Sequence, residues 1–161
     1  MKYTQLTILL LAFGCATPNV QMMTQEQVTT QKIVNHKLSK KQSFAALKSF
    51  LAKSLVNSNY SIRNEDFSSG SIMAKFVSVC PSGGMVDATI EYDLDIDFKD
   101  KKSRLTIVSN GSKMYSYISK EIELSPLGYS EEFYKSTKLC REQILEKFVE
   151  QLKAPAKNDD W

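Results

Sequence analysis

Histidine is almost absent from this chain of 161 residues: His36 is its only one. A metal site built from several histidines is therefore excluded. No serine, cysteine or carboxylate pattern around His36 is typical of nucleophilic catalysis, so we expect His36 to be structural. The chain also lacks a phosphate-binding loop, because Ser82-Gly83-Gly84 is not followed by a lysine and a helix. We therefore expect no catalytic residues, no metal site and no cofactor, and a protein that is not an enzyme.

A strong excess of one charge is missing as well. The formal net charge is only +3, with 24% charged and 42% hydrophobic residues. Such a balance is ordinary for a globular protein and argues against nucleic acid as a partner. The length suits one domain with a core of normal size.

No spanning helix is predicted at the N-terminus, although residues 6–13 are almost all apolar. A spanning helix takes about 20 such residues, whereas this run follows a basic start and matches the apolar part of an export signal. Gly14-Cys15 at its end resembles a bacterial lipobox. The resemblance implies a signal peptide over residues 1–14 and a covalent lipid on Cys15. The alternative is an ordinary secretory signal with an incidental cysteine.

Residues 15–30 are rich in Gln, Thr and Met and show no periodicity. We interpret them as a flexible tether between the lipid and the folded domain. In Gram-negative sorting an Asp after the lipidated cysteine favours the inner membrane, but this chain has Ala16. The expected location is therefore the outer membrane, facing the periplasm, with exposure at the cell surface as the other option.

The three cysteines fit export. Lipidation of Cys15 leaves an even pair, Cys80 and Cys140, for which we expect a disulfide in an oxidising compartment. The alternative is two separate buried thiols. An unstrained bridge between them would stabilise the fold by roughly 4 kcal/mol.

The clearest pattern in the chain is the alternation between residues 86 and 98. Every even position, from Val86 to Phe98, is apolar, and every odd position is polar. Period two predicts a long strand with one buried and one solvated face, inside an antiparallel sheet. The acidic side chains of the solvated face are Asp87, Glu91, Asp93, Asp95 and Asp97. They could bind Ca²⁺ or a cationic partner, but no calcium-loop spacing is present, and we favour a solvated face balanced by Lys75, Lys99 and Arg104.

A second strand is expected at residues 104–110, after a charged turn at residues 99–102. One register places apolar residues opposite each other on one face and opposite charges on the other. Its pairs are Phe98–Ser103, Ile96–Leu105, Leu94–Ile107 and Asp97–Arg104.

The remaining patterns complete an α+β fold. The expected strands are residues 31–38, 60–67, 71–79, 86–98 and 104–110. Helices are expected over residues 40–56, opened by a capping box of Ser39 and Gln42, and from Ser130 onward. The prediction is one α+β domain over residues 31–153, with a mobile tail at 154–161. It is a single antiparallel sheet of about five strands, in the order β-α-β-β-β-β-α, with two helices packed on one face.

Residues 111–129 show the least clear pattern of secondary structure in the chain. The best candidate patch for contact with a partner lies here, because tyrosine offers amphipathic contact area with little entropy cost. The patch is Met114, Tyr115, Tyr117 and Ile118. The alternative is a half-buried edge strand continuing from 104–110. A packed loop is expected at Ile122, Leu124, Pro126 and Leu127.

Three structural motifs carry a likeness to a known family. They are Leu38-Ser39-Lys40-Lys41 leading into Phe44-Ala45-Ala46-Leu47, the hairpin at Ser69-Gly70-Ser71-Ile72, and the strand 90–98 with its charged turn and Arg104-Leu105-Thr106-Ile107. Over about residues 31–152 the chain resembles a bacterial domain-of-unknown-function family with a TATA-binding-protein-like fold. That family is common in exported proteins and lipoproteins. The likeness implies the fold and not DNA binding, which an acidic face on an exported chain argues against.

The expected function is that of a non-enzymatic accessory module of the bacterial envelope. The lipid on Cys15 would hold the module at the membrane, and its partner would be another envelope protein or a cell-wall component, not nucleic acid. The alternative is a periplasmic carrier that holds a small apolar ligand between the helices and the sheet.

Overall fold

The computed structural model of the chain is built on one antiparallel sheet. It describes residues 21–55, 61–81, 87–116, 119–124, 128 and 130–154. The strands are β1 (Thr29–Asn35), β2 (Ser61–Asp66), β3 (Ser71–Pro81), β4 (Asp87–Lys99), β5 (Lys102–Ser116) and β6 (Ser119–Leu124). The helices are α1 (Gln25–Val28), α2 (Lys40–Leu55) and α3 (Glu131–Lys153). The strand order is β1-β5-β4-β3-β2, and β6 pairs with β5.

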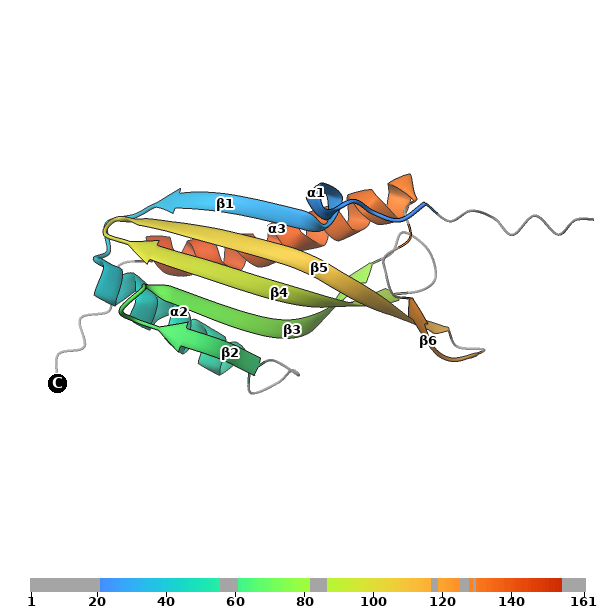
Figure 1. The fold of residues 1–161 in the computed structure, drawn as a ribbon, viewed down its shortest axis with the longest axis horizontal. Coiled ribbons are helices and arrows are strands. Elements are labelled where there is room, and N and C mark those ends of the chain that lie inside the picture. The colour runs from blue at the N-terminus through green and yellow to red at the C-terminus, as the bar shows by residue number, and fades with distance from the viewer. Residues whose placement is uncertain are drawn as a thin grey trace, which may run out of the picture.

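The helices α2 and α3 lie against the same face of the sheet (Figure 1). The opposite face carries no helix in the described part of the chain, and we call it the open face. This arrangement confirms the predicted α+β class, the single antiparallel sheet and the two helices on one face. The short α1 and the strand β6 are additions to the predicted order.

The long strand β4 lies at the centre of the sheet, between β3 and β5. Its even positions are all buried on the helix side and at most 3% exposed, namely Ala88, Ile90, Tyr92, Leu94, Ile96 and Phe98. The predicted register with β5 is confirmed at all four pairs, including Asp97 opposite Arg104. Alternation in the sequence therefore placed the core strand correctly.

Helix α2 begins where the capping box predicts. The Gln42 amide N–H donates to Ser39 Oγ at 3.3 Å, and the Ser39 N–H donates to Gln42 Oε1 at 3.0 Å. These two bonds satisfy backbone donors that a helix start leaves free. The helix then buries Leu47 and Leu51 completely against the sheet.

Helix α3 has its predicted N-cap, because Ser130 Oγ accepts the backbone N–H of Phe133. The spacing of the apolar residues in the sequence predicts one buried face, made of Phe133, Cys140, Ile144, Phe148 and Leu152. The buried residues are Thr137, Cys140, Arg141, Leu145, Phe148, Val149 and Leu152, whereas Phe133 and Ile144 are only partly buried. The stripe is thus wider than the prediction, and it includes an arginine.

The folded chain starts earlier than residue 31, which corrects the predicted end of the tether. Thr24 and Gln27 form a capping box that opens α1, and β1 follows at Thr29. β1 also ends at Asn35, so residues 36–38 leave the sheet instead of continuing the strand. A four-residue helix is too short to give a periodic signal, so the sequence pattern did not reveal it.

The predicted packed loop is wrong at Ile122 and Leu124, whereas Pro126 and Leu127 lie outside the described residues. Both residues lie in β6, where Ile122 pairs with Met114 and Leu124 pairs with Ser112. β5 therefore has β4 on one side and β6 on the other at this level. The expected edge strand is thus an inner strand here. Irregular registers in both pairings hide the alternation that would have marked β6.

Candidate functional site

A disulfide joins β3 to α3, as the cysteine count predicts. Cys80 and Cys140 are bridged with Cα atoms 6.0 Å apart, within the usual range. Cys80 is 1% exposed and Cys140 7% exposed. Nearby, the Ser136 hydroxyl donates to the carbonyl of Pro81 and holds the same two elements together. The buried bridge is therefore part of the structural core.

Next to the bridge lies Arg141, which is only 1% exposed. Its guanidinium donates to Ser109 Oγ at 3.0 Å, to Thr30 Oγ1 at 2.9 Å and to the carbonyl of Gln27 at 2.6 Å. These acceptors come from β5, β1 and α1, and all three are neutral. Arg141 thus ties the N-terminal segment of the domain to the sheet and to α3.

The sequence interpretation missed Arg141, although a signal was present. Arg141 lies four residues after Thr137 and four before Leu145, which is the spacing of one helix face. The residue type points the other way, because arginine is almost never fully buried without partners. Its partners lie far away in the sequence, so the helix pattern did not show them.

Tyr92 borders the same buried cluster from β4. Its hydroxyl lies 3.0 Å from Cys80 Sγ, and its ring lies 5.3 Å from that of Phe76. Burial raises the pKa of Tyr92 well above its ordinary value, and the charge of Arg141 opposes that shift only in part. Tyr92 therefore stays neutral and has a packing role.

His36 is structural in this fold, as expected. Its Nε2 atom lies 2.9 Å from the hydroxyl of Ser103, which is itself 1% exposed. Burial lowers the pKa of His36 below 6.5, while a backbone contact with Leu38 acts in the opposite direction. The imidazole is therefore held in its neutral form.

The acidic residues of β4 are largely compensated on the open face. Asp97 accepts a hydrogen bond from Arg104 Nε at 2.8 Å, and Glu91 forms an ion pair with Lys75. Asp93 accepts a hydrogen bond from Asn110. These contacts support the interpretation of a solvated, balanced face.

Asp95 differs from these three carboxylates in its electrostatics. Partial burial raises its pKa, and the neighbouring charges of Asp93 and Asp97 raise it further. No group of three or more metal-binding side chains occurs within the described ranges. The acidic stripe therefore gives no geometric support for a cation site.

Among the side chains that the structure describes, the large apolar ones exposed on the open face are Ile33 at 56%, Met73 at 45% and Val79 at 59%. Ile33 lies on β1, whereas Met73 and Val79 lie on β3, with β5 and β4 between them. Single exposed apolar residues are normal on protein surfaces. They do not form a continuous patch that would define a docking site.

A different surface is assembled at the end of the sheet where β4 turns into β5. Here the chain between β1 and α2 is bonded to the turn. The His36 N–H donates to the Lys101 carbonyl and the Lys101 N–H donates to the Leu38 carbonyl, both at 3.0 Å. The Lys40 N–H donates to Asp100 Oδ1 at 2.8 Å. Two distant segments are thus fixed side by side.

The turn between β2 and β3 closes the same end. Gly70 has φ +75, a left-handed conformation that favours glycine, and its carbonyl accepts the Phe98 N–H at 2.7 Å. Lys40 Nζ donates to the Ser68 carbonyl at 3.0 Å and lies 5.6 Å from the centre of the Phe67 ring. Three connections therefore meet at one end of the molecule.

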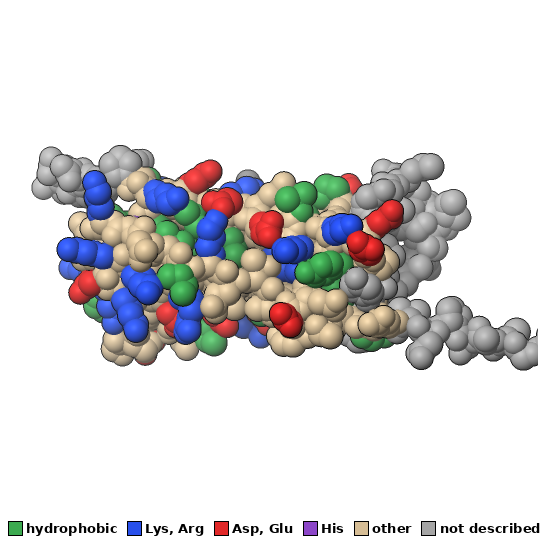
Figure 2. All heavy atoms as spheres, turned by 90° about the horizontal axis from the view of Figure 1, so that it is seen from above, with side chains coloured by type: hydrophobic (Ala, Val, Ile, Leu, Met, Phe, Trp, Pro, Cys, Tyr) green, Lys and Arg blue, Asp and Glu red, His purple; other side chains and the backbone are tan. Residues whose placement is uncertain are grey.

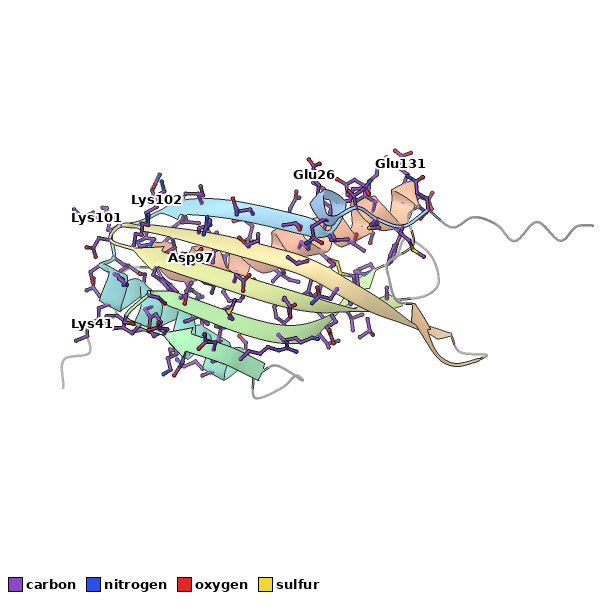
Figure 3. All side chains as sticks on the ribbon, viewed as in Figure 1. Glu26, Lys41, Asp97, Lys101, Lys102 and Glu131 are labelled. Atoms are coloured by element: carbon purple, nitrogen blue, oxygen red, sulfur yellow. A yellow bond between two sulfur atoms is a disulfide. The ribbon has the colours of Figure 1, made fainter. Side chains whose placement is uncertain are left out.

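We call this end the basic tip. It gathers six lysines, which are Lys37, Lys40, Lys41, Lys99, Lys101 and Lys102. All but the half-buried Lys40 are exposed. Figure 3 labels Lys41, Lys101 and Lys102 at this end of the sheet, and Glu26 and Glu131 towards the other end. Figure 2, seen from above, shows Lys and Arg side chains gathered at the same end.

The predicted contact patch is only partly placed by the structure. Met114 and Tyr115 lie in β5, within the part that pairs with β6. Tyr117 and Ile118 lie outside the described residues. The predicted lipidation site, Cys15, also lies outside them, as do the signal peptide over residues 1–14 and most of the predicted tail. The structure therefore brings together the two cysteines of the predicted disulfide.

No protein-family model matches the chain, and no curated protein matches its sequence. Solved structures do match its fold. One is a TBP-like protein from Parabacteroides distasonis, with TM-score 0.62 and 16% identity over 81% of this chain and 95% of that one. Another is a DUF4468 family protein from Bacteroides ovatus, with TM-score 0.62 and 8% identity over 88% of this chain and 95% of that one. These likenesses show a TBP-like fold and nothing about activity.

None of the helices in the described ranges is long and apolar enough to cross a membrane.

Proposed function

We propose that this chain is an exported bacterial lipoprotein whose α+β domain acts as a non-enzymatic interaction module of the envelope. The observation that carries the proposal is the run at residues 6–13 followed by Gly14-Cys15. The buried Cys80–Cys140 bridge supports export, since such bridges form and persist in oxidising compartments. The proposal includes a covalent lipid on Cys15 and no other cofactor. It places the protein at the outer membrane.

The packing favours an interaction module over a carrier of apolar ligands. A carrier needs space between helices and sheet, but the side chains that meet there are packed into one cluster. Leu47 and Leu51 of α2 and Leu94 and Ile96 of β4 are at most 1% exposed. Native mass spectrometry of the purified protein tests this choice, because a retained lipid-sized adduct would favour the carrier.

The anchor is tested by metabolic labelling with palmitate and membrane fractionation. We expect label on the wild-type chain in the outer-membrane fraction and none on Cys15→Ser. A matched Cys80→Ser/Cys140→Ser chain should still be labelled. Label on neither the wild type nor the double variant would overturn the lipoprotein proposal.

A further inference from the structure

We infer that the basic tip binds a polyanionic cell-wall polymer whose negative charges are carboxylates, as in the peptide stems of peptidoglycan. This inference names the partner class for the proposed envelope module and rests on that proposal for its location. It starts from the observation that the fold brings two lysine-rich segments, 37–41 and 99–102, to one end of the sheet.

Among the described residues of the three connections and their flanking positions, positive charge is in excess. The carboxylates there are Asp66 and Asp100, so six lysines minus two carboxylates leave an excess of four positive charges. Both carboxylates already accept backbone hydrogen bonds, Asp66 from Ser68 and Asp100 from Lys40. Hydrogen bonds from Ser68 and Ser69 hold the pKa of Asp66 at about 2. The nearby Arg104 is paired with Asp97 and adds no free charge.

The positive charges of the tip come from lysine, which favours a charged polymer as the partner over a folded protein. Protein interfaces are enriched in arginine and aromatic residues and depleted in lysine. Lysine is a hydrated point charge on a flexible stem, which suits negative charges that are spread along a chain. Phe67, the exposed aromatic ring at this end, packs edge-on against Phe44 at 5.4 Å and lies beneath Lys40. It is thus part of the support for the lysines.

The position of the tip argues against the anchoring bilayer as its partner. Met22 pairs with Gly128 beside the start of α3, whereas the tip lies at the end that α3 approaches with its C-terminus (Figure 1). The 23 residues of α3 make a helix about 35 Å long. The chain from Cys15 to Gln21 spans at most about 20 Å. A domain standing on its anchored end therefore presents the tip away from the membrane.

The test uses the full chain with Cys15→Ser, so that binding is measured without the lipid. The probe is insoluble peptidoglycan in a pull-down at low ionic strength, compared with the same peptidoglycan after its carboxylates have been amidated. We expect binding to the untreated polymer, loss on amidation, and weakening as salt screens the charges.

Three variants assign the binding to the tip. The tip variant Lys41→Gln/Lys101→Gln/Lys102→Gln should bind about fivefold more weakly, because it removes three exposed charge pairs that are each weak. The control Lys53→Gln/Lys138→Gln/Lys147→Gln removes the same charge from α2 and α3 and should bind as the wild type does. Arginine at the three tip positions should preserve binding.

Several results would overturn the inference. Equal weakening by the tip and control variants would mean a general charge effect. Binding to vesicles that contain anionic lipid, but not to peptidoglycan, would identify a membrane partner instead. Self-association that the tip variant abolishes would identify a second copy of this chain as the partner. Binding to neither peptidoglycan nor vesicles would show that the proposed cell-wall partner is wrong. Palmitate labelling is independent of all these readouts, so failure of the anchor and failure of the tip can be told apart.

Discussion

The two ends of the sheet both carry positive charge, yet they use it in opposite ways. Near the disulfide, Arg141 is 1% exposed and gives its N–H groups to Gln27, Thr30 and Ser109. At the basic tip, exposed lysines surround hydrogen bonds that are made by the backbone. The hydrogen-bond donors of the buried Arg141 are used within the fold, whereas the exposed lysines can contact a partner. The burial and the partners of a charged side chain, and not the sign of its charge, therefore decide whether it stabilises the fold or stays at the surface.

The disulfide end should show the largest loss of stability. Replacing both Cys80 and Cys140 with Ala removes a bridge between positions separated by 60 residues. We expect the free energy of unfolding to fall by about 4 kcal/mol, since the unfolded chain regains its freedom. Urea denaturation of the two proteins measures the difference. A loss below about 1 kcal/mol would show that the bridge is dispensable.

Arg141 should come next, and Arg104 is its matched control. Arg141→Met leaves the hydroxyls of Thr30 and Ser109 and the carbonyl of Gln27 without their donor. We expect a loss of about 3 kcal/mol, because unsatisfied buried polar groups are costly. Arg104→Met breaks an exposed pair with Asp97, whose side chains are 54% and 46% exposed, and should cost less than about 1 kcal/mol. Equal losses in urea denaturation would contradict the contrast between buried and exposed cations.

His36 supports the basic tip, so its titration should affect stability more weakly and only in acid. Because burial lowers its pKa below 6.5, the unfolded state takes up the proton first as the pH falls. The free energy of unfolding should therefore decrease as the pH falls below 6.5, and the imidazole should contribute no pH dependence above it. His36→Asn should flatten this part of the pH profile, since the chain has no other histidine. Identical slopes for the two proteins between pH 7 and pH 5 would be evidence against a buried neutral imidazole.

The lysines of the basic tip should have the smallest effect on stability. The variant Lys41→Gln/Lys101→Gln/Lys102→Gln changes three exposed side chains and leaves the backbone bonds in place. We expect the free energy of unfolding to stay within about 0.5 kcal/mol of the wild type. Thermal and urea unfolding check this value. A large loss would mean that the tip, like Arg141, belongs to the structural framework.

Much of the fold could be predicted from local patterns. The alternation over β4 identified its buried face, and the short turn at Asp100 then allowed only a register with Asp97 opposite Arg104. Ser39 and Ser130 marked the starts of α2 and α3 because an N-cap is a local hydrogen bond. Such interactions are made within a few residues, so the sequence displays them directly.

The candidate surfaces were harder to predict. The six lysines of the basic tip come from segments about 60 positions apart, and neither segment alone suggests a site. The secondary structure of segment 111–129 could not be predicted for another reason. Register shifts in the pairings of β5 break the period of two that marks a strand. The tyrosine patch drew attention by composition alone, without any evidence of which neighbours surround it.

Local patterns in the chain were enough to predict the strands, the register of β4 with β5, the helix caps and an even pair of cysteines. The burial of Arg141, the pairing of β6 with β5 and the meeting of lysines from two connections at one tip became visible only in the folded molecule. The two groups differ in the range of the interactions that they depend on. Alternation and capping depend on neighbours along the chain. The hydrogen bonds of Arg141 and of Lys101 instead join segments that are far apart in the sequence and meet only in the folded protein.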